Sequence, residues 1–145
     1  MDAFSQIRLN NTMDIQIISI PKIEDFTGNV GVIEGSTAPF EIKRIFYLYD
    51  IQGDSKRGRH AHKELKQFIV AIYGSFEVMV TNGTDNEVVK LTAPDKGLLI
   101  NPGLWSELYN FSPGAVCMVL ASDTYDESDY IRNYEDYLNY VAVSK

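Results

Sequence analysis

The sequence predicts an all-β protein, a sandwich or barrel of short strands that ends in one α-helix. Two observations carry this prediction. Short segments rich in Val, Ile, Phe and Tyr recur at close spacing and are separated by polar, Gly- or Pro-containing turns. Only the last segment repeats its apolar residues at steps of three and four, as a helix does. With 145 residues the chain fits a single domain, residues 1–145, with one substantial core.

The expected strands follow one another as far as residue 121. Ser75–Thr81 is the clearest, because Phe76, Val78 and Val80 alternate with more polar neighbours. Leu65–Tyr73 is almost continuously apolar and stops at a glycine. The other expected strands are Ile15–Ile20, Val30–Glu34, Glu41–Asp50, Glu87–Thr92, Gly97–Asn101, Ser106–Phe111 and Ala115–Ala121, with a polar turn at Asn82–Asn86.

The C-terminal segment is predicted to form an α-helix that packs against the barrel. Its apolar residues recur with helical spacing from about Ser128 to Val143, and Ser128 or Asp129 is expected to cap the start. Four tyrosines on this segment are expected to be packing residues with one wet edge rather than a ligand site. They are Tyr130, Tyr134, Tyr137 and Tyr140.

Charge and composition exclude several classes of function. A formal net charge of -7 argues against a general nucleic-acid binder, although a local basic cluster still suits one diphosphate. No segment is long and apolar enough to span a membrane, and the first residues lack the pattern of a signal peptide, so a cytoplasmic protein is expected. The single cysteine, Cys117, is expected to be a buried thiol. The candidates for the basic cluster are Lys43, Arg44, Lys56, Arg57 and Arg59.

The two histidines of the chain, His60 and His62, stand one residue apart in the segment RGRHAH at positions 57–62. Side chains at this spacing on a strand project from the same face, so we expect the two imidazoles to point together. Such a pair supports a metal site, because imidazole binds zinc, iron, copper and nickel. It equally supports paired proton transfer, because histidine titrates near neutral pH. The choice depends on which other side chains converge on the same point.

The spacing around the pair resembles the cupin superfamily, whose fold is a double-stranded β-helix or jelly-roll barrel. Its first motif follows the two histidines with a glutamate and, six residues on, a glycine; here Gln67 replaces the glutamate. Its second motif carries a histidine after a Pro-x-Gly-like turn, where this chain has Ser106. A metal cupin uses that glutamate and that histidine as ligands beside the pair. Because Gln67 and Ser106 are poor ligands, metal-free acid–base catalysis is the favoured interpretation.

Within the cupins, three segments resemble the sugar 3,4-ketoisomerase family, which acts on dTDP-4-keto-6-deoxyglucose. They are PFEIKRIFYLYD, RGRHAHKELKQ and ASDTYDESDYIRNYEDYL, and the likeness runs from about Ile15 to the C-terminal helix. The resemblance implies conversion of the 4-keto sugar to its 3-keto isomer through an enediolate, for 3-amino-3,6-dideoxy sugars of a lipopolysaccharide O-antigen or an S-layer glycan. By analogy, His60 removes the C3 proton and His62 serves the C4 side. No metal or nicotinamide cofactor is required, because the net change is an internal redox.

Further residues around the pair are expected to bind the dTDP-linked sugar. Arginines bind a diphosphate bidentately, although on a regular strand Arg57 and Arg59 face away from the histidines. On another expected strand, Arg44 faces one way and two tyrosines the other, and one of these faces should line the pocket. Trp105 either stacks on the ligand or packs in the core. The expected binding residues are Arg44, Tyr47, Tyr49, Arg57, Arg59, Gln67, Asn101, Trp105 and Ser106, with Gln67 bonding a sugar hydroxyl or a histidine.

Two positions leave the stereochemistry of the product open. Some relatives carry a histidine or arginine where this chain has Ser106, and an arginine near the position of Thr27. Such residues would border the pocket and control which face of C4 receives its proton. The configuration of the product, galacto or gluco, is therefore undetermined.

Three rival functions remain open, together with the oligomeric state. They are a metal-dependent cupin, a dTDP-sugar 3,5-epimerase and a non-catalytic nucleotide-sugar-binding cupin. The epimerase family pairs a histidine with a tyrosine and an aspartate, so the HAH run is not its signature. A homodimer is expected, because strand exchange or sheet pairing covers exposed edges, and the segment around Ile15–Ile20 is the candidate for that role.

Overall fold

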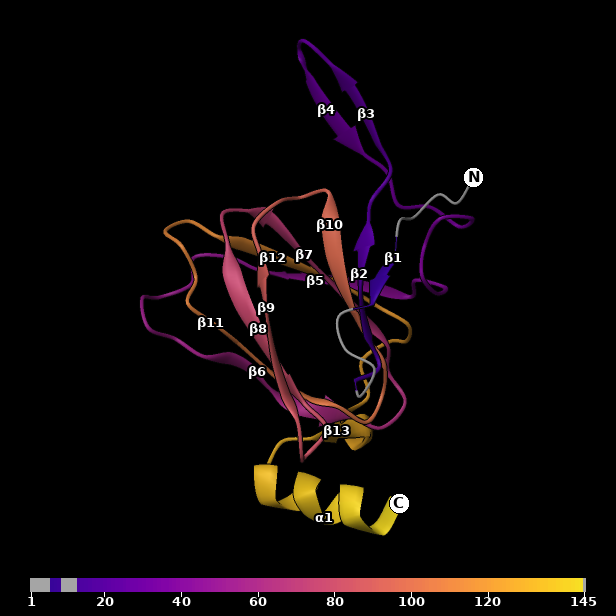
Figure 1. The fold of residues 1–145 in the computed structure, drawn as a ribbon, viewed down its shortest axis with the longest axis vertical. Coiled ribbons are helices and arrows are strands. Elements are labelled where there is room, and N and C mark those ends of the chain that lie inside the picture. Colours follow the sequence, from indigo (N-terminus) through magenta and orange to yellow (C-terminus); the bar gives the residue numbers. More distant parts are fainter. Residues whose placement is uncertain (1–5, 9–12, 145) are drawn as a thin grey trace.

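The computed structural model describes residues 6–8 and 13–144, which form two antiparallel sheets packed face to face (Figure 1). The sheets have the strand orders β1-β2-β10-β7-β12-β5 and β13-β6-β11-β8-β9. Their strands are β1 (Gln6–Arg8), β2 (Ile15–Ser19), β5 (Arg44–Leu48), β6 (Arg57–His62), β7 (Gln67–Tyr73), β8 (Phe76–Thr81), β9 (Asn86–Leu91), β10 (Lys96–Ile100), β11 (Trp105–Tyr109), β12 (Val116–Ala121) and β13 (Tyr130–Ile131). The predicted all-β fold with one C-terminal helix is confirmed.

The core lies between the two sheets and follows the alternation of the strands. β8 buries its three alternating apolar residues there, as its sequence pattern predicts. β7 is buried on both faces: Ile69 joins the core between the sheets, whereas Phe68 belongs to a second cluster, against which Phe40 and Ile42 pack. This double burial explains the continuous apolar run of β7. Cys117 is buried in the same core, and burial raises the pKa of its thiol to about 12, so the predicted buried thiol is confirmed.

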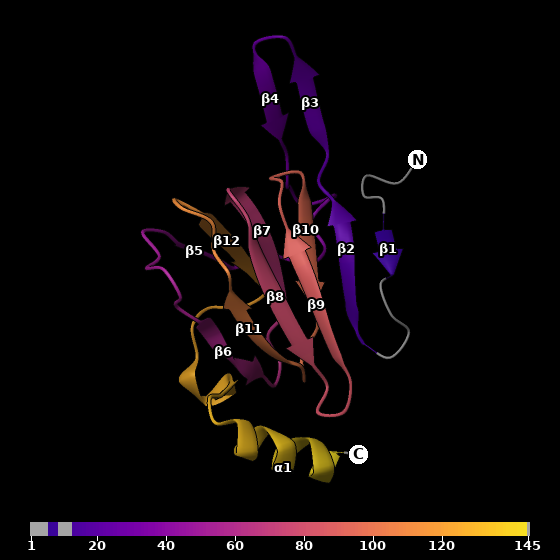
Figure 2. The same cartoon turned by 60° about the vertical axis from the view of Figure 1, so that its left-hand side comes forward.

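A hairpin of β3 (Lys22–Asp25) and β4 (Gly28–Gly31) projects beyond the sheets (Figures 1 and 2). The sequence predicts only one strand in this region, at Val30–Glu34. Every residue of both strands is exposed, and Phe26 at the tip is fully so. An isolated two-stranded ribbon is marginally stable in water. Its apolar side chains therefore form a surface that nothing in residues 6–8 and 13–144 covers.

The N-terminal strand β2 is an interior strand of its sheet. It pairs with β10 on one side and with β1 on the other. β2, in the segment Ile15–Ile20, is therefore not an edge strand. Within the described residues, neither side of this strand is left unpaired for the expected pairing with an edge of a partner subunit. The exposed hairpin, rather than β2, is the part of the N-terminal region that projects toward solvent (Figure 2).

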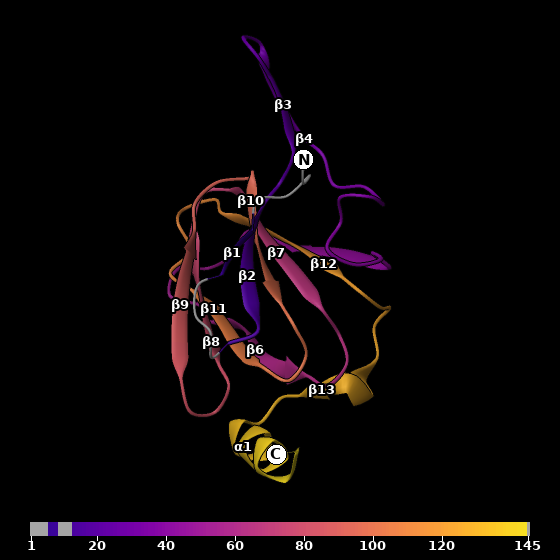
Figure 3. The same ribbon diagram turned by 45° about the vertical axis from the view of Figure 1, so that its right-hand side comes forward.

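The C-terminal helix α1 (Tyr134–Ser144) lies across the end of the sheets opposite to the hairpin (Figure 3). Asn133 caps it, because its side-chain oxygen accepts a hydrogen bond of 3.0 Å from the backbone N–H of Asp136. Tyr137 is fully buried and donates its hydroxyl to the carbonyl of Gly103 at 2.8 Å. The expectation that helix tyrosines are packing residues is confirmed for Tyr137. No helix within the described ranges is long and apolar enough to cross a membrane.

The segment just before α1 differs from the prediction. Residues expected in the first turns of the helix form a 3-10 turn, η1 (Glu127–Asp129), followed by β13. β13 pairs with β6, with Tyr130 opposite His62. This backbone pairing ends before the helix begins, so the predicted cap at Ser128 or Asp129 is wrong. The consequence is that this segment lies directly against the histidine pair.

Candidate active site

The histidine pair lies on β6, and its two rings are neighbours as predicted. The ring centroids of His60 and His62 are 4.7 Å apart, with the planes at 72°. Ser106, on the neighbouring strand β11, is buried and pairs with His60. Before the pair the strand is irregular, because Gly58 has a φ of 60° and the pairing with β11 shifts register before Leu108. The bulge places the regular part of β6 at the pair itself.

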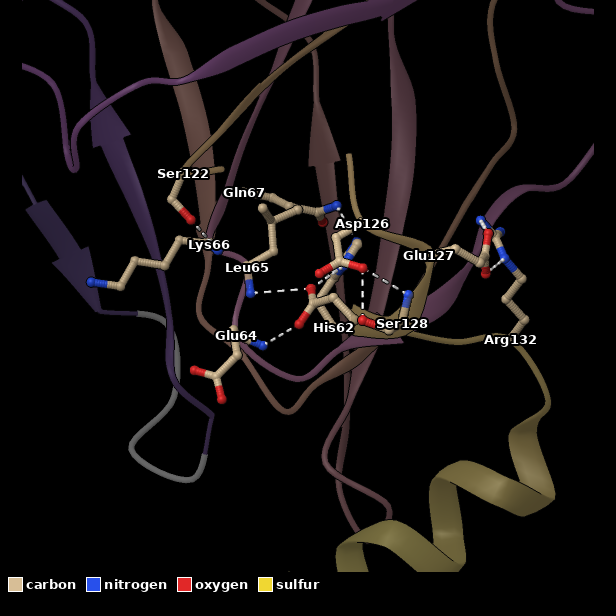
Figure 4. Close-up of polar contacts among 11 residues, drawn as sticks. His62, Glu64, Leu65, Lys66, Gln67, Ser122, Asp126, Glu127, Ser128 and Arg132 are labelled. Carbon is tan, nitrogen blue, oxygen red and sulfur yellow. Dashed lines mark hydrogen bonds and ion pairs between the residues drawn. The ribbon is translucent and has the colours of Figure 1, made fainter. Parts of the chain in front are cut away.

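His62 is 5% exposed and is held on both sides of its ring. Its Nδ1 lies 2.9 Å from a carboxylate oxygen of Asp129, and its Nε2 lies 3.0 Å from the amide nitrogen of Gln67. Figure 4 shows the side chains of His62 and Gln67 directed toward each other. Of the two partners predicted for Gln67, the histidine is the one observed. Burial lowers the pKa of His62, while the hydrogen bond and charge of Asp129 oppose that shift.

Asp129 also holds the turn that joins β6 to β7. Its side chain accepts hydrogen bonds from the backbone N–H of Glu64 at 2.7 Å and of Leu65 at 3.3 Å. Its backbone carbonyl accepts a third, from the N–H of Lys63 at 3.0 Å. Figure 4 shows Glu64 and Leu65 beside His62 in this arrangement. One residue therefore fixes both the ring of His62 and the chain that leads to Gln67.

His60 has a different environment. Its Nδ1 is buried and has no hydrogen-bond partner among the described residues. Burial is the main cause that lowers the pKa of His60 to about 4, and positive charge on His62 and Arg132 adds to it. His60 is therefore a neutral imidazole near physiological pH, and its Nδ1 neither accepts nor donates a hydrogen bond within residues 6–8 and 13–144.

Tyr130 packs against both imidazoles. Its ring centroid lies 5.1 Å from that of His60 and 4.3 Å from that of His62. On its own flank it contacts Arg132, whose guanidinium carbon is 4.2 Å from the Tyr130 ring centre. Arg132 in turn donates two hydrogen bonds to Glu127, at 2.8 and 2.9 Å (Figure 4). The Tyr130 ring thus packs on both imidazoles, and Arg132, held by Glu127, packs on the Tyr130 ring.

A pocket of about 150 Å³ opens beside His62, between β5, the β6–β7 turn and the chain that precedes β13. Arg44 lines it, and its Nε is buried without a hydrogen-bond partner among the described residues. The guanidinium carbon lies 5.1 Å from the ring centre of Phe46 and 5.7 Å from that of Tyr125. Of the two faces of β5, the face of Arg44 thus lines this pocket. The remaining lining residues are Glu64, Leu65, Ser122, Asp123, Thr124, Asp126, Asp129 and Tyr130.

Several residues expected to bind substrate lie elsewhere. Tyr47 and Tyr49 are 60% and 62% exposed on the other side of β5. Arg59 lies on the outer face of β6, 3.6 Å from Glu107, and Arg57 is exposed at the start of the strand. Asn101 donates its amide to the carboxylate of Asp14 at 2.9 Å. None of these contacts brings the residue to the histidine pair.

Of the two roles predicted for Trp105, ligand stacking and core packing, the structure shows core packing. It is 1% exposed, belongs to one buried cluster with Ala61, Ile131 and Tyr137, and donates its ring N–H to Glu107 at 3.0 Å. A ring covered on both faces by the barrel and by α1 has no surface left for a sugar or a base. Ser106, by contrast, lies beside His60 as the motif predicts.

The donor set does not fit a divalent metal. Beside the two imidazoles, the side chains at the other two motif positions are Gln67 and Ser106, and neither is a ligand that a divalent metal prefers. Within residues 6–8 and 13–144, no group of three or more His, Cys, Asp or Glu side chains lies close enough to hold a metal ion. Structural and catalytic metal sites need at least three such ligands.

Sequence reasoning missed Asp129 and Tyr130 as parts of this site. Both lie in a segment whose apolar spacing resembles a helix start, and this spacing predicts a cap at Asp129 and a helix residue at Tyr130. The available signal was the run of four acidic residues between 123 and 129, an unusual density just after an apolar strand. Backbone pairing of β13 with β6 brings them to the pair across more than sixty residues of sequence.

These features define a cupin-type barrel enzyme in which two neutral imidazoles are available for proton transfer. The chain belongs to the family described as "FdtA: WxcM-like, C-terminal", which matches residues 13–142.

Known relatives agree with this assignment. The chain is 42% identical over 131 residues to TDP-4-oxo-6-deoxy-alpha-D-glucose-3,4-oxoisomerase of Aneurinibacillus thermoaerophilus, covering 90% of this chain and 94% of that protein. A crystal structure of a 3,4-ketoisomerase from Helicobacter canadensis superimposes with a TM-score of 0.87 at 42% identity, covering 90% and 98%. The sugar 3,4-ketoisomerase QdtA from Thermoanaerobacterium thermosaccharolyticum, solved with TDP, gives 0.87 at 36% identity, covering 94% and 98%.

Proposed function

We propose that this protein is a TDP-4-keto-6-deoxyglucose 3,4-ketoisomerase that works by histidine acid–base catalysis without a metal. The observation that carries the proposal is the histidine pair, in which Nδ1 of His60 has no hydrogen-bond partner in the described part of the chain and His62 is held by Asp129 and Gln67. The names of the relatives support the substrate and the reaction. A histidine-to-asparagine variant of QdtA, 36% identical to this chain, has been solved with TDP-4-keto-6-deoxyglucose, which supports the same substrate class.

Two protons must move for the ketone to pass from C4 to C3. The adjacent ketone acidifies the C3–H bond, so a neutral imidazole can remove this proton and leave an enediolate. In the proposed mechanism His60 takes the C3 proton and delivers it to C4. His62 takes the proton of the C3 hydroxyl at Nε2, once a substrate oxygen replaces the amide of Gln67 there, and returns it to the C4 oxygen. Both rings end neutral, and no external electron acceptor is needed.

Substrate binding is proposed to extend from the histidine pair and Gln67 into the pocket beside His62. Arg44 is the cation of this pocket whose Nε lacks a hydrogen-bond partner among the described residues, which suits a diphosphate or sugar oxygen. The carboxylates that line the same pocket suit sugar hydroxyl groups as acceptors of hydrogen bonds. The amide of Gln67 is released for a sugar hydroxyl when the substrate displaces it from His62.

The test is to incubate the purified protein with freshly made TDP-4-keto-6-deoxyglucose and EDTA and to follow the sugar by NMR. The proposal predicts a 3-keto isomer whose C4 proton couplings give the galacto or gluco configuration. Formation should be lost in both His60→Asn and His62→Asn. Activity that appears only after a divalent metal is restored would favour a metal-dependent cupin. Binding without turnover, unaffected by His60→Ala, would favour a nucleotide-sugar-binding protein.

A homodimer is part of the proposal, and the β3–β4 hairpin supports it. The hairpin exposes Ile23, Phe26 and Val30, and a ribbon with apolar side chains is stabilised when another surface covers it. Size-exclusion chromatography with light scattering should give the mass of a dimer for the wild-type protein. Phe26→Asp should shift the measured mass toward that of a monomer. Asn29→Asp, a charge added on the same hairpin, is the matched control and should remain dimeric. A monomeric wild-type protein would contradict this assignment.

The cellular setting remains a prediction from the sequence. We propose a cytoplasmic location and a route in which the 3-ketone becomes a 3-amino-3,6-dideoxy sugar of a glycan such as an O-antigen or an S-layer glycan. The chemical support is that a ketone at C3 is what an aminotransferase requires. Fractionation of cells tests the location, and conversion of the product by an aminotransferase with an amino donor tests the route.

A further inference from the structure

The side chain of Asp129 contacts three groups that belong to the catalytic motif rather than to its own segment. They are the Nδ1 of His62 at 2.9 Å and the backbone N–H groups of Glu64 and Leu65. The carboxylate is 14% exposed, so its bonds form in a setting largely closed to water. Asp129 therefore bonds both the His62 ring, where it affects which nitrogen carries the proton, and the backbone of the β6–β7 turn.

The hydrogen bonds fix the tautomer of His62. A carboxylate only accepts hydrogen bonds, so the Nδ1 that faces Asp129 carries the proton. A neutral imidazole then has an unprotonated Nε2, and this atom accepts from the amide N–H of Gln67. The two contacts agree with each other, since an amide nitrogen has only hydrogens to offer.

The segment that carries Asp129 is fixed independently of His62. Asp126 caps η1 by accepting from the N–H of Ser128 at 3.0 Å. Arg132 is bound by Glu127 through two hydrogen bonds and rests on the ring of Tyr130. Other charged or titratable groups facing the His62 ring are Arg44, His60 and Tyr130. In the described part of the chain, none of these three groups forms a hydrogen bond with the His62 ring, whereas the carboxylate of Asp129 does and so specifies the position of the ring proton.

We propose that Asp129 is a positioning residue, which holds His62 in the Nδ1–H tautomer so that its unprotonated Nε2, which faces Gln67, can accept a proton. This inference rests on the proposed function for its kinetic consequence but not for the tautomer. With the opposite tautomer, Nε2 of His62 carries a proton and cannot take one from the C3 hydroxyl. The residue acts through His62 and makes no contact with the reacting carbons.

The first test needs no substrate. Long-range 15N–1H NMR of the histidine rings in the wild-type protein should show His62 protonated at Nδ1 and unprotonated at Nε2. Asp129→Asn should convert His62 to the Nε2–H tautomer, because its oxygen keeps the shorter bond, from the N–H of Glu64 at 2.7 Å, and its amide N–H then faces Nδ1. This orientation gives up the longer bond from the N–H of Leu65, at 3.3 Å. Asp126→Asn is the matched control and should leave the ring of His62 unchanged. An Nε2–H tautomer in the wild type, or no change in Asp129→Asn, would overturn the proposal.

The second test is kinetic. Asp129→Asn should lower kcat by about tenfold or more, as loss of an orienting partner does, while KM changes by no more than about threefold. Asp129→Ala should in addition reduce the thermal stability, because the β6–β7 turn loses its anchor, and Asp129→Glu should restore part of kcat. Unchanged kcat in Asp129→Asn with a converted tautomer would contradict the positioning role. If the wild type itself lacks ketoisomerase activity, the proposed function fails while the NMR result still decides the tautomer.

Discussion

His60 and His62 are one residue apart on β6, and the protein surrounds them in opposite ways. His62 is bound at both nitrogens, by Asp129 and by Gln67. His60 has a buried Nδ1 without a partner among the described residues, and burial lowers its pKa to about 4. One imidazole is thus part of the hydrogen-bonded framework, while the other is held chiefly by packing against Tyr130 and the neighbouring ring.

The difference separates stability from reactivity. A buried polar atom without a partner costs free energy, and such atoms concentrate where a ligand is to supply the partner. The hydrogen bonds around His62 fix the position of one ring proton, whereas Nδ1 of His60, which no described residue bonds, can receive another. The comparison therefore predicts that substitutions on the two sides of the pair differ in what they damage.

The largest effect is expected for His60→Asn on turnover. Loss of a general base costs about 10²–10⁴-fold in rate, so kcat in the NMR assay should fall by about a thousandfold. The melting temperature should stay close to that of the wild type, because the Nδ1 of His60 makes no hydrogen bond with the described residues. A variant that keeps a tenth of the activity or more would contradict the role of His60.

The next effect is a pH dependence of folding that comes from the buried pair. His60 has a folded pKa of about 4 against 6.5 for the ordinary group, and the pKa of His62 is lowered as well. Between about pH 4 and pH 6.5 the unfolded chain therefore binds more protons than the folded chain. The contribution of His60 to the free energy of unfolding is fully present above about pH 6.5 and is lost as the pH falls toward 4. His60 alone contributes about 3 kcal/mol over this range. Urea unfolding at several pH values should show a smaller loss in His60→Asn than in the wild type, and an equal loss would contradict the shift.

A smaller effect is expected on the free energy of unfolding near neutral pH, where His62→Asn should lose more stability than His60→Asn. Removal of the His62 ring leaves Asp129 and Gln67 without their partners in a buried site, which costs about 1–3 kcal/mol. Urea unfolding should give this decrease for His62→Asn and a decrease below about 0.5 kcal/mol for His60→Asn. Equal losses for the two variants would remove the asymmetry between the rings.

The smallest effect is expected on the outer face of the same strand. Arg59 lies next to the pair in sequence, but its side chain is 61% exposed and pairs with Glu107 at 3.6 Å. Arg59→Ala should therefore change stability by less than about 0.5 kcal/mol and leave kcat and KM within about twofold. A large rise of KM would instead place Arg59 at the substrate, against the face that it occupies.

The pair itself was predictable from the sequence, because a two-residue repeat on a strand fixes which side chains point together. Gln67 and Ser106 were predictable from motif spacing for the same local reason. Asp129 and Tyr130 were not predictable, because the apolar spacing of their segment fits a helix start. The strand pairing that forms instead, between β13 and β6, joins residues far apart in sequence. Trp105 shows the converse limit: an aromatic ring serves a core or a ligand equally well until α1 covers it. The β3–β4 hairpin escaped prediction because its first strand has no buried face and so no alternating pattern.

The most direct test of the central claim is the reaction in deuterated buffer with EDTA, followed by proton NMR of TDP-4-keto-6-deoxyglucose. If His60 and His62 move the ketone from C4 to C3, the C3–H signal disappears, a 3-keto isomer forms and the C5 proton remains. The same sample with His60→Asn should show the unchanged substrate. Deuterium at C5 with the ketone still at C4 would contradict this account and identify a 3,5-epimerase.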